Sequence, residues 1–184
     1  MTLLKKYPIL TLVTVLAVTL FFGCESNLKE VQKSNFTDFV PSGEAEKINL
    51  KYTDSGRIKV ILVSPKMLEY GNVNFPFTEF PKGIDVTLYD KNGKRTFVKS
   101  DYATSYKLTN LIDLKGNVTI TTQDGQNLET DQLYFDQKNE WFYTEKKFKF
   151  TDPKGVSNGQ GIDFSKDFKF INSQKIAGEI ESDE

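Results

Sequence analysis

The chain has 184 residues, of which 24 are basic and 25 acidic, so its formal net charge is −1. Without a surplus of basic residues, the chain creates no field that would attract nucleic acid. It contains no His and a single Cys, which excludes a Ser-His-Asp or Cys-His nucleophile, the usual Cys/His zinc site and an internal disulfide. The carboxylates that a hydrolase could still use, Asp90, Asp124 and Asp152, lie at turns, where Asp serves local hydrogen bonding. We therefore expect no enzyme, no catalytic residue, no metal and no cofactor.

The first 23 residues have the features of a secretory signal. Lys5 and Lys6 give it a positive start, and an apolar run of about 14 residues follows over 9–22. A membrane-spanning helix needs roughly 20 apolar residues. The sequence therefore predicts a signal peptide over 1–23, with a short uncleaved membrane anchor as the alternative.

Residues 20–24, Leu-Phe-Phe-Gly-Cys, resemble the lipobox of bacterial lipoproteins. In that motif a small residue, here Gly23, precedes a Cys that is lipidated and becomes the mature N-terminus, while Phe21 stands where Leu is usual. The resemblance implies that Cys24 is lipidated; the other interpretation is an incidental Cys at the end of an uncleaved anchor. Two or three acyl chains would hold the protein firmly on a membrane.

The region after the leader divides into a polar segment and a β-rich one. Residues 24–47 are polar and mixed in charge, which predicts a flexible tether. From residue 48 onward, apolar and polar residues alternate in short runs between turns, which is typical of strands. We expect one all-β domain over 48–180, followed by a solvated acidic tail at 181–184. The strands are expected around 48–52, 58–62, 84–88, 118–120, 133–135, 141–143, 148–150, 162–164 and 176–180.

The turns recur with a period close to 30 residues. In the most regular unit, 116–136, the pair Asp124-Gly125 predicts a type I′ hairpin turn, because Gly adopts positive φ freely. A strand repeat of this length predicts stacked strand pairs, and hence two antiparallel sheets that face each other across one apolar interior. The turn glycines, at intervals of 37, 32 and 30 residues, are Gly56, Gly93, Gly125 and Gly155.

Side-chain alternation assigns thirteen apolar residues to that interior. The simpler interpretation is that they form a closed core. A stack with open ends allows a second one, an apolar trough that takes an acyl chain, and the sequence leaves both open. The thirteen are Ile84, Val86, Leu88, Val118, Ile120, Leu133, Phe135, Phe148, Phe150, Ile162, Phe164, Phe168 and Phe170.

Several motifs follow one another at fixed spacing through the β region. They are Phe-Pro-Lys-Gly-Ile at 80–84, Ser-Asp-Tyr-Ala at 100–103, Gly-Asn-Val at 116–118 with Thr-Asp-Gln-Leu at 130–133, Gly-Gln-Gly-Ile-Asp-Phe at 159–164 and Gly-Glu-Ile at 178–180. In their order and spacing they resemble the OstA-like family of lipopolysaccharide-export proteins, to which LptC components belong.

The resemblance implies an open, twisted β-jellyroll whose trough, lined by the thirteen residues, accepts the acyl chains of lipopolysaccharide. The chains would come from the subunits of an inner-membrane ABC transporter and pass to a periplasmic LptA-like bridge protein, while ATP is hydrolysed elsewhere in the complex. The domain would be held on the periplasmic side of the inner membrane, by the Cys24 lipid or by the N-terminal segment. Better-known family members carry a spanning helix, from which the lipobox of this chain departs. The alternative function is a membrane-anchored lipoprotein that binds protein partners through its sheet edges around a closed core.

Overall fold

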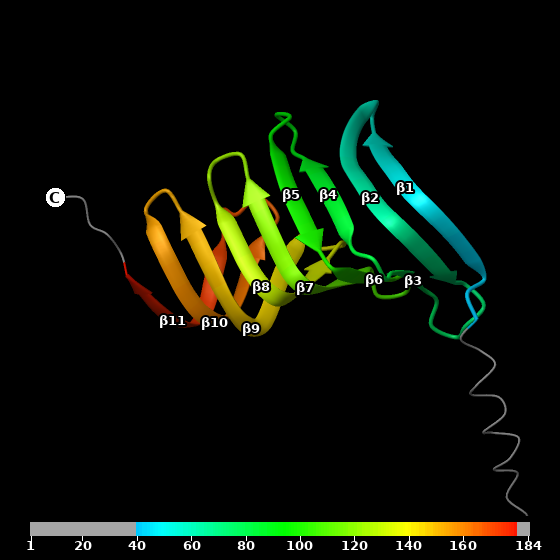
Figure 1. Cartoon of the computed structure of the whole chain (residues 1–184). Helices are drawn as coiled ribbons and strands as arrows, with labels where there is room; N and C mark the ends of the chain where they lie inside the picture. The colour runs from blue at the N-terminus through cyan, green and yellow to red at the C-terminus, as the bar shows by residue number, and fades with distance from the viewer. Residues whose placement is uncertain (1–39, 180–184) are drawn as a thin grey trace, which may run out of the picture. The chain divides into compact units, whose positions relative to one another are not determined.

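The computed structural model describes residues 40–179, and this part of the chain consists of antiparallel β-strands without any helix (Figure 1). Accordingly, these residues include no helix long and apolar enough to cross a membrane. The expected signal peptide, Cys24, most of the expected tether and the acidic tail lie outside the described residues. The eleven strands are β1 (Gly43–Asp54), β2 (Arg57–Tyr70), β3 (Phe77–Phe80), β4 (Ile84–Tyr89), β5 (Arg95–Ser100), β6 (Tyr102–Tyr106), β7 (Leu111–Thr122), β8 (Asn127–Asp136), β9 (Trp141–Asp152), β10 (Gly155–Ser165) and β11 (Ile171–Glu179).

All strands belong to one hydrogen-bonded sheet, whereas the sequence predicts two antiparallel sheets that face each other. The sheet folds into two layers because its long strands bend and continue from one layer into the other. The upper layer contains β4 and β5, and the lower layer contains β3 and β6 (Figure 1). Both short pairs lie between β2 and β7, which pair with β4 and β5 in one layer and with β3 and β6 in the other. β3–β4 and β5–β6 are therefore two further bent strands, each interrupted at the bend.

Register shifts mark the bends and explain why simple alternation does not continue along a whole strand. The pairing shifts between Lys115 and Val118 in β7 and between Gln160 and Ile162 in β10. Gly116 and Gly161 have φ of 73° and 74° at these points, a conformation that Gly adopts without steric cost. Each shift inserts residues between two buried runs. Which alternate residues face the interior must therefore be worked out separately for the part of the strand in each layer.

The first strand begins at Gly43, five residues before the start expected at residue 48. Its early part pairs with β2, Ala45 opposite Met67, and an ion pair of 2.5 Å joins Glu44 to Lys66. The charges that indicated a tether are instead those of a solvated edge strand, where charged residues are common.

The turn at Asp124-Gly125 differs from the expected type I′ turn. The Gly125 N–H donates to the carbonyl of Thr122 at 3.3 Å, and the Thr122 N–H donates to the carbonyl of Gln126 at 2.9 Å. Only Gly125 has positive φ, so the connection is a three-residue loop built on a type I turn. The two-residue turn with positive φ at both positions occurs instead at Ser55-Gly56, with φ of 51° and 76°.

Gly83 and Gly93 provide a matched test of the bend geometry, because their φ values are 79° and 81°. A Cβ at Gly83 would lie 2.4 Å from the carbonyl oxygen of Ser100, whereas a Cβ at Gly93 would have no neighbour within 4 Å. We expect Gly93→Ala to lower the free energy of unfolding by about 1 kcal/mol, from its backbone conformation alone. Gly83→Ala should lower the free energy of unfolding by at least about 3 kcal/mol, because the backbone between β3 and β4 must also move away from Ser100. Chemical denaturation measures both; equal losses would contradict the close contact at the bend.

Candidate functional site

Among residues 40–179, apolar side chains from β2 to β10 and the loop after β10 gather in the interior between the two layers. In the upper layer, strand register aligns Val86, Val98, Ile120, Leu128 and Phe150 in one row across five strands. Ile120 is fully buried, and the other four expose 9 % or less of their surface. This row forms one wall of the interior.

The lower layer supplies the opposite wall. Ala103, Leu114 and Leu133 follow one another across β6, β7 and β8, and all three are buried. A second row is aromatic: the rings of Phe135 and Phe142 stack at 4.4 Å between centroids, and those of Phe142 and Phe164 at 5.2 Å. Stacked rings of this kind contribute beyond the area that they bury. The two walls form one continuous hydrophobic cluster.

Twelve of the thirteen residues expected to face inward belong to this cluster. Eleven are buried, and Phe135 is partly buried against them. Phe170 does not face inward: it is 67 % exposed, so its assignment to the interior was wrong. It lies in the connection between β10 and β11, where strand alternation no longer determines the direction of a side chain. Whether the other twelve contact lipid stays a prediction.

Six further buried residues of this cluster were absent from the sequence-based set. Phe142 was missed because no residue of the strand expected at 141–143 was assigned to the interior, although an even spacing from Phe148 and Phe150 indicated Phe142. Leu128 lies five residues before Leu133, an odd spacing that alternation cannot accommodate without the register shift between them. The six are Phe80, Val98, Ala103, Leu114, Leu128 and Phe142.

The ring of Phe168 fills the space between the two walls beside β10. This residue lies in the loop after β10, is 6 % exposed, and stacks on Phe164 at 4.7 Å and on Phe150 at 6.2 Å. Phe150 and Phe164 belong to opposite layers, so the ring of Phe168 bridges both walls. The Phe168 backbone has φ of 56°, which is unusual for a bulky residue and indicates local strain.

Polar groups hold the loop that carries Phe168. The Phe168 N–H donates to the carbonyl of Ser165 at 2.8 Å, and the Ser165 hydroxyl donates to the carboxylate of Asp167 at 2.8 Å. Lys169, with its ammonium 2.7 Å from Asp167, lowers the pKa of that carboxyl to about 2. Asp167 is therefore ionised at neutral pH and keeps the loop folded back on the sheet.

The end of the interior at β1 is open. Leu50 pairs with Leu62, which in turn pairs with the buried Val86, so Leu50 continues the upper wall. Yet Leu50 is 50 % exposed, and Tyr52, two residues further on the same side of β1, is 63 % exposed. We call this end, formed by β1 and the adjoining part of β2, the mouth. The interior thus runs from an exposed apolar mouth through a packed centre to the ring of Phe168.

The hydroxyl groups at the bends show no arrangement suited to nucleophilic catalysis. Ser64 donates to the carbonyl of Gly83 at 2.8 Å, and Thr130 to the carbonyl of Lys147 at 2.8 Å. Both hydroxyls therefore satisfy backbone carbonyls where strands turn between layers. The Ser100 hydroxyl is buried without a hydrogen-bond partner, so no base holds its proton among the described residues. Within residues 40–179, no group of three or more Cys, Asp or Glu side chains is placed to hold a metal ion.

A polar network covers the outer surface of the lower layer. Asp113, 4 % exposed, accepts a hydrogen bond from Gln132 at 2.9 Å and an ion pair from Lys115 at 2.8 Å. This contact with Asp113 raises the pKa of the Lys115 ammonium. The Tyr102 hydroxyl donates to Glu79, and burial together with this carboxylate raises the pKa of the Tyr102 phenol. These polar groups all have hydrogen-bond or ion-pair partners within the network. The network therefore supports the lower wall structurally.

Comparison with known proteins identifies one matching family. A family model described as "Lipopolysaccharide-assembly, LptC-related" matches residues 10–172. No curated protein gives a match to the chain.

Proposed function

Because this chain belongs to the LptC-related lipopolysaccharide-assembly family, we propose that it carries lipopolysaccharide acyl chains between its two layers during export. Members of this family are in general transport components on the periplasmic side of the inner membrane, and it is not a known enzyme family. In the proposed role, the acyl chains come from the transporter subunits in the inner membrane and pass to a periplasmic bridge protein of the LptA kind. The folded sheet would act as an open, twisted β-jellyroll.

The observation that carries the proposal is the continuous apolar interior with its exposed mouth. Leu50 and Tyr52 leave apolar surface exposed where a buried row begins, and such surface is costly in water unless something covers it. Each methylene transferred from water into an apolar site gains about 0.8 kcal/mol, so a fatty-acyl chain of roughly twelve carbons would gain about 9 kcal/mol. That gain is large enough to keep an acyl chain in the interior rather than in periplasmic water.

The packed centre requires that the two layers separate as lipid advances. Ile120 and Leu133 are completely buried, so an acyl chain can lie there only in place of their present contacts. Replacing these side-chain contacts by contacts with an acyl chain costs little free energy, because the side chains meet an apolar chain instead of water. The layers are continuous at the bends and approach each other elsewhere through apolar contacts, which favours separation on the side away from the bends.

Site-specific photo-crosslinking in membranes that contain the assembled transporter tests the proposal. We expect a benzophenone amino acid at Leu62, near the mouth, and at Ile120, in the centre, to label lipopolysaccharide when ATP is supplied. Thr119 is the matched control, because it neighbours Ile120 but pairs with Lys99 and Glu129 on the outer surface. Equal labelling from Thr119 and Ile120, or labelling from Thr119 alone, would refute lipid carriage in the interior.

The packed centre also favours a second candidate, a membrane-anchored module that binds proteins through its sheet edges. In that case Phe142 and Phe164, each 1 % exposed, would form a permanent core. The same experiment separates the two functions, since a permanent core gives no lipid crosslink from Ile120 under any condition. We further propose that Cys24 is lipidated or that the N-terminal segment stays in the membrane; mass spectrometry of the purified protein distinguishes the two anchors.

A further inference from the structure

The two layers end in rims that differ in chemistry. The upper rim contains the turns at Ser55-Gly56, 91–93, 123–125 and 153–154, whose residues are polar, charged, Gly or Pro. The lower rim contains the connections 71–76, 107–110, 137–140 and 166–170. Backbone hydrogen bonds link these connections in series: Lys107 N–H to the carbonyl of Pro76 at 3.2 Å, Gln137 to Asn110 at 3.0 Å, and Lys166 to Glu140 at 2.9 Å. The lower rim is thus one connected edge.

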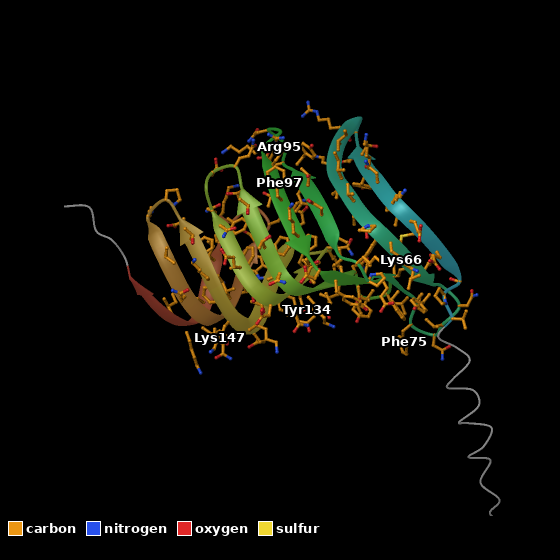
Figure 2. The ribbon with its side chains drawn as sticks, in the orientation of Figure 1. Lys66, Phe75, Arg95, Phe97, Tyr134 and Lys147 are labelled. Atoms are coloured by element: carbon orange, nitrogen blue, oxygen red, sulfur yellow. The ribbon has the colours of Figure 1, made fainter. Side chains whose placement is uncertain are left out.

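Large apolar side chains project from the lower rim. Phe75 is 76 % exposed, Leu108 64 % and Phe170 67 %. Figure 2 shows Phe75 on the outside of the sheet, beyond the end of β2. Exposed phenylalanine and leucine at loop tips contribute little to the fold, so their presence on three connections of one rim, and on no turn of the other, calls for a partner.

Phe75 and Leu108 lie on connections that hydrogen bonds and an ion pair link to the segment just before β1. Ser42 donates through its backbone N–H to the carbonyl of Glu69 at 2.7 Å and accepts, through its hydroxyl, a hydrogen bond from the Gly71 N–H at 2.8 Å. The Lys107 ammonium in turn lies 2.5 Å from the Glu69 carboxylate. These contacts tie the strand start, the β2–β3 connection and the β6–β7 connection together. The exposed residues on the three segments, Val40, Phe75 and Leu108, form what we call the apolar tip; Val40 is 71 % exposed.

We propose that the apolar tip inserts into the surface of the lipid bilayer that holds the N-terminal segment. The inference rests on the membrane attachment in the proposed function, but not on lipid carriage. The apolar run that ends at residue 22 lies 18 residues before Val40. A chain of that length reaches at most about 65 Å when fully extended, so attachment of the run keeps the tip near the membrane.

The chemistry of the tip fits a lipid surface better than a protein partner. The three side chains stand on three separate segments, and a fluid bilayer requires no matching shape. Lys107 and Glu69 at the base of the tip neutralise each other, which lowers the cost of bringing them to the interface. Apolar side chains on a membrane-bound surface bury about 5–10 Å into the boundary between headgroups and acyl chains. Insertion would hold the mouth, at the same end of the sheet, close to the membrane that supplies its lipid.

Quenching of tryptophan fluorescence by brominated lipids tests this placement in the full-length chain. The protein is reconstituted into vesicles of phosphatidylethanolamine and phosphatidylglycerol, with or without phosphatidylcholine brominated on its acyl chains. Trp141, the only native tryptophan, is replaced by Phe, and a new one is introduced by Phe75→Trp. The matched control is Ile58→Trp, at an apolar site that is 41 % exposed beside an upper-rim turn.

We expect brominated lipid to reduce the emission of the Phe75→Trp protein about twofold or more, and that of the Ile58→Trp protein little, because only the former reaches the acyl boundary. Adding Leu108→Ser and Val40→Ser to the Phe75→Trp protein should weaken the quenching. Equal quenching at positions 75 and 58, or none at position 75, overturns the proposal; the latter is the outcome expected of a tip that suits a protein partner rather than lipid. A failed crosslink from Ile120 would leave the quenching difference intact, so the two proposals fail separately.

Discussion

Alanine in place of Phe168 is expected to lower the free energy of unfolding by about 3 kcal/mol, and glycine in the same place by less. The loss common to both comes from the ring that bridges Phe150 and Phe164 between the two walls. The difference comes from the backbone, since φ of 56° is strained for alanine and free for glycine. This order is the reverse of the usual one within strands, where glycine is the more destabilising residue.

Equilibrium denaturation of the two variants checks the order. The mechanism would be contradicted if glycine proved the more destabilising, because the positive φ would then carry no strain. Removal of the ring also leaves space between the two walls beside β10. If the proposed function holds, the Phe168→Gly protein should show stronger lipid crosslinking from position 150 than the unsubstituted chain, since the ring no longer occupies that space.

Substitution of Phe142 by alanine is expected to cost about 4 kcal/mol, whereas Trp141→Ala should cost roughly 1 kcal/mol. Phe142 is 1 % exposed and stacks on Phe135 and Phe164, so its loss leaves a cavity between the walls. Trp141, next to it, is only partly buried and points to the outer surface, where water can fill the space that it leaves. Thermal or chemical unfolding of the two variants measures the difference.

The pair Phe142 and Trp141 also tests which side of β9 faces the interior. The sequence assigned neither residue to the interior, whereas the structure buries Phe142 there and predicts the larger loss for Phe142→Ala. Similar losses at both positions would contradict the burial of Phe142 between the layers.

The strands were the part of the fold that the sequence predicted well, for a clear physical reason. Ile84, Val86 and Leu88 alternate strictly with polar residues, and all three are buried, because β4 lies within one layer and never reaches a bend. Local alternation is enough to define such a strand. The same holds for Val118 and Ile120, which follow the bend in β7 without a further shift.

The bends and the first strand could not be predicted from alternation. In β8, Leu128 and Leu133 face the same interior from opposite sides of a register shift, and their odd spacing hides this relation. β1 carries Glu44 opposite Leu68 and Glu46 opposite Lys66, so its charges concealed a strand that owes its place to pairing with β2. Phe168 was correctly assigned to the interior, but as a strand residue. The structure places it in a loop, where its own backbone has positive φ.

The order of the strands has a consequence for how the domain folds. Each bent strand, with β3–β4 and β5–β6 counted as one each, pairs only with the strands before and after it in the chain. Stability in such an array is close to a sum of nearest-neighbour terms, and folding can proceed by adding one hairpin to the last. During synthesis, each strand can therefore join the sheet as soon as it is complete, without waiting for a distant partner. The same arrangement lets either end fray while the rest of the sheet stays folded, which keeps terminal strands available for exchange without loss of the domain.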